Sequence, residues 1–224
     1  MKWGPIAAVL VGLSAFILPA ILIGLALAAF SEDSFSVFYD SLSTNSRVLI
    51  NILSATGGLA IIWVYIRKKG GLKALGFRKN AIDKLLSRSV LGYIVYFATT
   101  LVTFALLALT NLIDLDQEQD LGLTSIQGFE WYVVFLGLVV VAPIFEEVLF
   151  RGFIYQGFKK VLPFWPAALM SSLIFALAHG QLNVAVDTFI LAMVATWLFN
   201  RYNNIYPAIL IHMLKNAVAF AFLL

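Results

Sequence analysis

Long apolar runs, separated by short polar segments, follow one another along the whole chain. About 20 apolar residues cross a bilayer as a helix, and seven runs approach or exceed this length. They cover roughly residues 4–30, 47–66, 89–113, 131–151, 164–180, 184–200 and 205–223. The pattern predicts an all-α, polytopic transmembrane helix bundle of about seven spans. Only a short polar link, residues 179–183, divides the fifth run from the sixth.

Composition supports a membrane location. The chain is 62% hydrophobic and only 12% charged, whereas soluble domains carry about 25% charged residues. We therefore expect residues 1–224 to form a single integral membrane domain whose main partner is the lipid bilayer. The first run is about 25 residues long, beyond the core of a signal peptide, and predicts a retained helix. A net charge of +3 gives no indication of a nucleic-acid partner, and the lack of cysteine excludes disulfides and thiol catalysis.

Charged residues between the runs predict the orientation of the chain. The segment 67–88 holds eight basic residues and one acidic residue, Asp83. The segments 31–46 and 114–130 are instead acidic. Because positively charged loops stay on the cytoplasmic side, we expect a multi-pass protein of the cell membrane with a cytoplasmic N-terminus. The basic segment could also contact anionic lipid head groups.

Ionisable and amide side chains recur inside the apolar runs from residue 131 onward, whereas the first three runs hold few. Such groups are costly in lipid and usually face the bundle interior or a wet cavity. We therefore divide the chain into supporting spans, residues 1–113, and catalytic spans, residues 131–223. The polar positions concerned are Glu146, Glu147, Arg151, His179, Asp187, His212 and Asn216. Asp187 has no partner that the sequence identifies, and we assign it no role.

The two adjacent glutamates are predicted to have different roles. Glu147 and Arg151 stand at i and i+4 with the acid first, which is the favourable order for an ion pair on one helix face. We expect this pair to shape the site. Glu146 lies about 100° around the helix from Glu147 and lacks such a partner. It is therefore the candidate catalytic carboxylate.

Residue spacing places Glu146 opposite His179. If the helix that holds Glu146 continues to Lys159 and turns at Leu162 and Pro163, Glu146 lies 16 residues before Leu162 and His179 lies 17 after it. At 1.5 Å per residue, both are about 24 Å from the turn, at one depth in an antiparallel hairpin. A carboxylate and an imidazole facing each other there could hold and deprotonate a water molecule.

The last run adds a second candidate pair. His212 and Asn216 are i and i+4 on one helix face, and both can donate hydrogen bonds to an oxyanion. Asn216 could equally bridge two membrane helices. Glu146, His179 and His212 also form a permitted zinc set, so the residues leave zinc and metal-free water activation open. The chain contains no H-E-x-x-H, G-x-S-x-G or phosphate-loop motif.

Three motifs in this order resemble the CPBP family, the CAAX proteases and bacteriocin-processing enzymes that are also called the Abi family. They are E-E-x-x-x-R at residues 146–151, F-x-x-x-H at 175–179 and H-x-x-x-N at 212–216. The likeness covers residues 146–216, and the first three spans match only in being hydrophobic. The resemblance implies an all-helical intramembrane endopeptidase with its cavity open toward the cytosol.

The resemblance also implies roles for individual residues. Glu146 and His179 would activate the attacking water, while His212 and Asn216 would stabilise the oxyanion. The family is often labelled metalloprotease, whereas comparison with its eukaryotic members favours a glutamate-based mechanism without metal, and we favour no cofactor. This short chain is more similar to the bacterial or archaeal branch, where prenylated CAAX substrates are not expected.

These observations favour an intramembrane peptidase that cleaves a peptide or membrane-associated protein near the cytosolic leaflet. The alternative is a non-catalytic membrane protein, such as a bacteriocin immunity factor or the partner of a transporter or sensor kinase. A proton or ion pathway is a third possibility, because buried Glu and His can relay protons. The ionisable groups at depth are confined to one half of the chain, which argues against a pathway across the membrane. Substrate and oligomeric state are not predicted.

Overall fold

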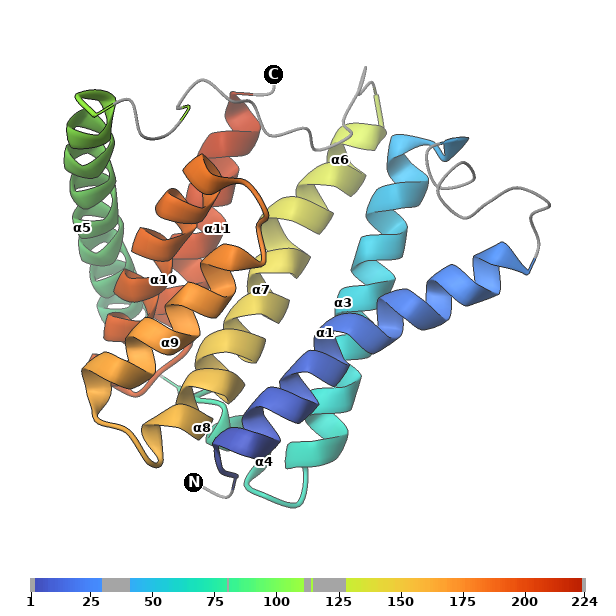
Figure 1. The fold of residues 1–224 in the computed structure, drawn as a ribbon, viewed down its shortest axis with the longest axis horizontal. Coiled ribbons are helices and arrows are strands. Elements are labelled where there is room, and N and C mark those ends of the chain that lie inside the picture. The colour runs from blue at the N-terminus through green and yellow to red at the C-terminus, as the bar shows by residue number, and fades with distance from the viewer. Residues whose placement is uncertain (1–2, 30–40, 80, 111–113, 115–127, 223–224) are drawn as a thin grey trace.

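The computed structural model describes residues 3–29, 41–79, 81–110, 114 and 128–222. These residues form a bundle of helices joined by turns (Figure 1), so the predicted all-α fold is confirmed. Most of the acidic positions expected in the segments 31–46 and 114–130 lie outside the described residues. Outside the central helix, the helices are α1 (Pro5–Ala28), α3 (Thr44–Ile66), α4 (Gly71–Ala74), α5 (Ile82–Ala108), α9 (Phe164–Leu177), α10 (Leu182–Tyr202) and α11 (Tyr206–Ala221).

Local residue chemistry explains where several helices begin and end. Pro5 opens α1, where its fixed φ suits the first turn and its missing N–H costs nothing. At α3, the Ser43 side chain accepts a hydrogen bond from the Ser46 N–H at 3.3 Å, which caps the helix. Asn203 ends α10 in the left-handed conformation with φ of 49°, a position that asparagine tolerates better than most residues.

One continuous helix, residues 130–159, runs through the middle of the bundle (Figure 1). It alternates between α turns and wider π turns, and its parts are α6 (Glu130–Phe135), η1 (Leu136–Val141), α7 (Ala142–Glu147), η2 (Val148–Tyr155) and α8 (Gln156–Lys159). The expected span, 131–151, is therefore too short, because the helix continues to Lys159 as the hairpin argument requires. The turn that carries both glutamates lies between the two π segments, and π turns are frequent at functional sites.

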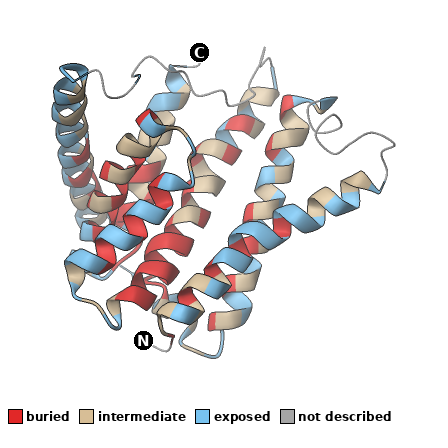
Figure 2. Cartoon of the chain, in the orientation of Figure 1, coloured by how far each residue is buried: buried red, intermediate tan, exposed pale blue. Residues whose placement is uncertain are grey.

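The second half of this central helix forms the core of the protein. Every residue from Val148 to Tyr155 is buried, as Figure 2 shows by the unbroken red of that segment. By contrast, α5 exposes large apolar side chains along most of its length, as expected of a helix that faces lipid. The buried stretch includes Arg151, so a charged group is packed inside the core.

Within the described part of the chain, five helices are long and apolar enough to cross a membrane, counting residues 130–159 as one. The apolar helices α9 and α11 have only 14 and 16 residues. At 1.5 Å per residue, 14 residues span about 21 Å, less than the roughly 30 Å of a hydrocarbon core. All seven expected apolar helices are thus present. However, α9 ends at Leu177 and does not reach the level of the upper ends of α6 and α11 in Figure 1.

Close backbone contact fixes where α1 crosses α3. A Cβ on Gly58 would lie 2.4 Å from the Ala15 carbonyl oxygen and 2.5 Å from the Phe145 ring. A Cβ on Gly57 would lie 2.9 Å from the ring of Pro19. Only glycine permits this approach, so the two helices touch at this level. Beyond it α1 leans away from α3, which Figure 1 shows at the upper right.

Candidate functional site

Glu147 and Arg151 form the predicted ion pair. The Arg151 guanidinium lies 3.0 Å from Glu147 Oε1, and both side chains are almost completely buried. Burial of such a pair is tolerated only when each charge keeps its partner. The guanidinium also lies over the Phe175 ring, at 4.6 Å from its centre. The predicted i,i+4 contact is thus present in the structure, and its role in shaping the site stays a prediction.

Glu147 has a second partner that the spacing argument missed. The same Oε1 atom lies 3.0 Å from His212 Nδ1, which links the central helix to α11. A carboxylate oxygen accepts, so Nδ1 of His212 donates in this contact. The ring is thereby held in one orientation, with Nε2 directed away from Glu147.

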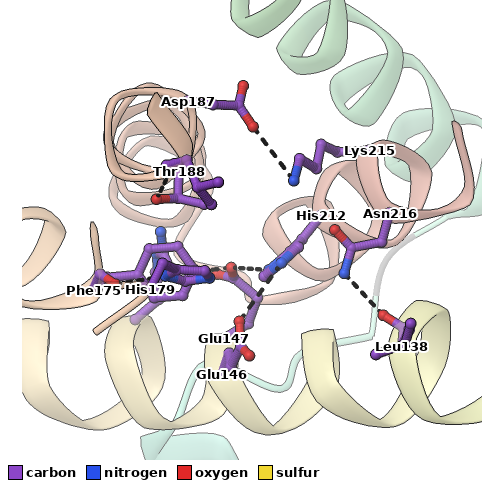
Figure 3. A network of polar contacts seen from close by, with 12 residues as sticks. Leu138, Glu146, Glu147, Phe175, His179, Asp187, Thr188, His212, Lys215 and Asn216 are labelled. Carbon is purple, nitrogen blue, oxygen red and sulfur yellow. Dashed lines mark hydrogen bonds and ion pairs between the residues drawn. The ribbon is translucent and has the colours of Figure 1, made fainter. Parts of the chain in front are cut away.

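Glu146 lies on the other side of this imidazole. Its Oε2 atom is 3.6 Å from His212 Nε2, and its side chain keeps 24% of its exposure, whereas that of His212 keeps 4%. The separation exceeds an ordinary hydrogen bond, so the two groups face each other without a direct bond. His212 thus lies between a fully buried carboxylate that orients it and a partly exposed carboxylate that can reach solvent or substrate (Figure 3).

His179 is oriented by its own helix end. Its Nδ1 lies 2.9 Å from the Phe175 carbonyl oxygen, and since a carbonyl can only accept, Nδ1 carries the proton and Nε2 is left for other partners. The expected hairpin exists, because α9 returns along the buried half of the central helix. Among the described residues, however, the close contact of Glu146 is with His212, and the expected pairing with His179 is not one of the contacts formed.

Phe175 is a site residue to which the sequence analysis assigned no role. Its ring meets the two imidazoles edge to face, with centroid distances of 4.8 Å to His179 and 5.8 Å to His212. It also packs against Phe150 at 4.9 Å. The ring is buried and separates the polar groups from one another. Its place in the F-x-x-x-H motif was the signal that could have identified it.

Asn216 connects α11 to a π turn of the central helix. Its Nδ2 donates to the Leu138 carbonyl oxygen at 2.8 Å, within η1, where the wider turns displace carbonyl groups from ordinary helical partners. The bridging role that the sequence left open is therefore present. The amide still has a second N–H available for another acceptor.

Asp187, which had no partner in the sequence argument, has two in the structure. Tyr96 on α5 donates to Asp187 Oδ1 at 2.6 Å, and the Lys215 ammonium lies 3.3 Å from Asp187 Oδ2. Lys215 directly precedes Asn216, so this cluster lies beside the site (Figure 3). It ties three helices together by polar contacts, and no spacing rule within one helix could have revealed it.

A cavity of about 390 Å³ lies beside Glu146. One wall is the central helix at Leu138, Ala142 and Glu146, while the others come from α1 and α3. The first two spans, expected only to support the site, thus enclose it on one side. These wall residues belong to the halves of α1 and α3 that are remote from the basic segment 67–88.

The hypothetical zinc set, Glu146, His179 and His212, was tested against this geometry. Among the residues that the structure describes, no three His, Cys, Asp or Glu side chains are grouped closely enough to hold a metal ion. His212 Nδ1 and His179 Nδ1 are both engaged by protein acceptors. These Nδ1 contacts leave Nε2 of both rings as the atoms that a metal would bind, so the absence of a metal stays a prediction.

Fold and site together define a multi-pass helical membrane protein with a buried carboxylate and imidazole site. Comparison with known families agrees, since residues 127–218 match the model for type II CAAX prenyl endopeptidase Rce1-like proteins. The matched region contains all three motifs. Over residues 127–218 the chain is therefore similar to CAAX prenyl endopeptidases, the same kind of protein that the motifs resemble.

Individual relatives are more distant. The chain is 28% identical over 160 residues to UPF0177 protein YbdI of Lactococcus lactis. This alignment covers 69% of this chain and 84% of the relative. It is 27% identical over 191 residues to UPF0177 protein YaiH of the same organism. That alignment covers 81% of this chain and 74% of the relative. "Putative membrane peptidase YdiL" of Bacillus subtilis is 30% identical over 77 residues, 34% of this chain and 32% of that protein. No solved structure matches the chain.

Proposed function

We propose that this protein is an intramembrane endopeptidase that hydrolyses a peptide or a membrane-associated protein. The observation that carries the proposal is the position of Glu146, which lines a cavity of about 390 Å³ and faces His212 Nε2 at 3.6 Å. The buried Glu147 orients the same imidazole. A carboxylate beside an oriented imidazole at the edge of a cavity supplies the groups that general base catalysis requires.

In the proposed reaction, Glu146 takes a proton from a water molecule that His179 helps to hold through its free Nε2. The water oxygen forms a bond to the carbonyl carbon of the scissile peptide, and the oxyanion accepts hydrogen bonds from Asn216 and from His212 when that ring is protonated on both nitrogens. The C–N bond then breaks, and Glu146 returns the proton to the departing amine. One water is consumed, and no further reactant is needed.

The depth of the reaction follows from the position of Glu146 in its helix. It is the seventeenth of the 30 residues between Glu130 and Lys159, so it stands near the middle of the longest apolar helix. We therefore propose that cleavage takes place within the membrane. The proposed cytoplasmic N-terminus rests on the charge of the loops alone.

The proposal is tested by incubating the purified protein, reconstituted in vesicles, with a library of apolar peptides. Glu146→Ala and His179→Ala are the matched variants, and both should lose cleavage while remaining folded. Equal cleavage by the parent chain and both variants would contradict the peptidase assignment and favour a non-catalytic membrane protein.

Metal dependence is tested separately. The purified protein is analysed for bound metal, and hydrolysis is measured with and without a chelator. We expect the rate to be unchanged by the chelator, because the proposed steps use only side chains. Loss of activity that zinc restores would replace the metal-free mechanism.

A further inference from the structure

A groove between α1 and α3 leads to Glu146. The cavity beside Glu146 shares Ala20, Asn51 and Ser54 with a second cavity of about 490 Å³. The second cavity continues between the two helices toward Ala28, at the end of α1. The shared residues make the two cavities parts of one groove, with Glu146 at its inner end.

The crossing of α1 and α3 explains why the groove exists. Gly57 of α3 packs against the Pro19 ring of α1, and Gly58 packs against the Ala15 carbonyl, which closes the space below. Above this point α1 leans away, so the two helices form a fork (Figure 1). Phe145, adjacent to Glu146, packs at the base of the fork against Gly58.

Two polar side chains on α3 have no evident purpose in an apolar wall. The Ser54 hydroxyl is buried and has no hydrogen-bond partner in the described part of the chain. Asn51 is exposed and lines both cavities, and its side chain makes no hydrogen bond to any described residue. Unpaired amide and hydroxyl groups are costly in a membrane, so an occupant that supplies hydrogen-bonding groups would relieve both.

We propose that this groove binds an apolar polypeptide segment in a non-helical conformation, with Asn51 and Ser54 hydrogen-bonded to its backbone and its scissile carbonyl beside Glu146. The inference rests on the proposed peptidase function and adds the substrate class and two positioning residues. A helical segment satisfies its own backbone groups and offers them to neither side chain. A lipid acyl chain has no donors or acceptors and would leave both unpaired.

The position of the groove also determines where a substrate enters. The wall residues lie in the last half of α1 and the first half of α3, at the end of the bundle opposite the basic segment. A substrate therefore enters from that end or from the side of the bundle. This differs from the cavity open toward the cytosol that the family resemblance implied.

Because the chain contains no cysteine, a single introduced cysteine can carry a photoreactive benzophenone. We would compare Asn51→Cys with Leu53→Cys, since Leu53 lies at nearly the same depth on α3 but is 59% exposed and lines neither cavity. Both are made in a Glu146→Gln background to prevent turnover. The probe is a biotinylated Leu/Ala peptide of about 20 residues with a central Gly-Pro break, in phosphatidylcholine vesicles.

We expect strong peptide adducts from position 51, weak ones from position 53, and competition by unlabelled peptide at position 51 only. Equal labelling at the two positions, or adducts with phosphatidylcholine alone at position 51, would overturn the proposal. Labelling needs no cleavage, so the groove is tested even if the parent chain fails to hydrolyse the peptide, an outcome that would count against the peptidase function only.

A kinetic measurement tests the positioning role. Replacing Asn51 by Leu together with Ser54 by Ala should raise KM for the same peptide about tenfold, the loss expected for two hydrogen bonds, and leave kcat nearly unchanged. Leu53→Ala serves as the control and should change neither. A fall in kcat with constant KM would place the lost interactions in the transition state and outside substrate binding, and would contradict the inference.

Discussion

Adjacent carboxylates with different surroundings form the centre of this site. Glu147 is fully buried between Arg151 and His212, whereas Glu146 keeps 24% of its side-chain exposure. The first orients an imidazole and neutralises a guanidinium, and the second faces a cavity. Two adjacent glutamates can therefore differ in function, because a step of one residue along the helix turns the side chain by about 100°.

Glutamine substitutions should separate these two functions. Glu146→Gln should abolish hydrolysis with little change in thermal unfolding, because a partly exposed carboxylate is replaced by an amide of the same shape. Glu147→Gln should lower the stability by about 3 kcal/mol, since a buried guanidinium loses its counter-charge. Hydrolysis rates and thermal unfolding in detergent measure the two effects. Similar stability losses in both variants would contradict this division.

The Phe175 ring predicts a third effect at the residue scale. Phe175→Ala removes the surface against which two imidazoles and a guanidinium pack, so we expect a loss of about 3 kcal/mol and a large fall in kcat. Phe175→Leu retains apolar volume and should recover most of the stability but less of the activity. Full activity in Phe175→Leu would show that the ring only fills space.

At the scale of single elements, the polar contact between α11 and the central helix has two consequences. Asn216→Leu removes the hydrogen bond to Leu138 and should cost about 1 kcal/mol of stability. If the second N–H stabilises the oxyanion, kcat should fall about a hundredfold. Measuring both quantities in one variant separates bridging from catalysis, because bridging alone would leave kcat within a few fold of the parent value.

The crossing of α1 and α3 is a second test at this scale. Gly58→Ala places a methyl group against the Ala15 carbonyl and the Phe145 ring, so the helices must separate. We expect a loss of about 2 kcal/mol and reduced hydrolysis, because Phe145 directly precedes Glu146. Gly4→Ala, which meets no atom within 4 Å, is the control and should behave as the parent chain does.

Helix content and the Glu147–Arg151 pair could be predicted from sequence because each depends on periodicity within one helix. The π segments could not, since a wider turn leaves the apolar pattern of residues 136–155 unchanged. The contact between Glu146 and His212 was missed for a related reason. It depends on how α11 is placed beside the central helix, and depth counted along a hairpin contains no such information.

At the scale of the whole molecule, the Asp187 cluster joins helices that the motifs do not. Tyr96, Asp187 and Lys215 come from α5, α10 and α11. Asp187→Asn leaves the ammonium without its counter-charge and should lower stability by about 2 kcal/mol. Tyr96→Phe removes one hydrogen bond and should cost less, about 1 kcal/mol. Thermal unfolding compares the two, and equal effects would show that the ion pair contributes little.

The π turns of the central helix also relate its geometry to single-residue insertions and deletions in the gene. Each such turn accommodates one residue more than an α turn does, as if a single codon had been inserted into a regular helix. Deleting one residue from 136–141 would restore α geometry and leave the residues beyond it on the same faces, because the wider turn absorbs the extra residue locally. In this part of the chain, three nucleotides decide whether the Leu138 carbonyl is displaced toward Asn216.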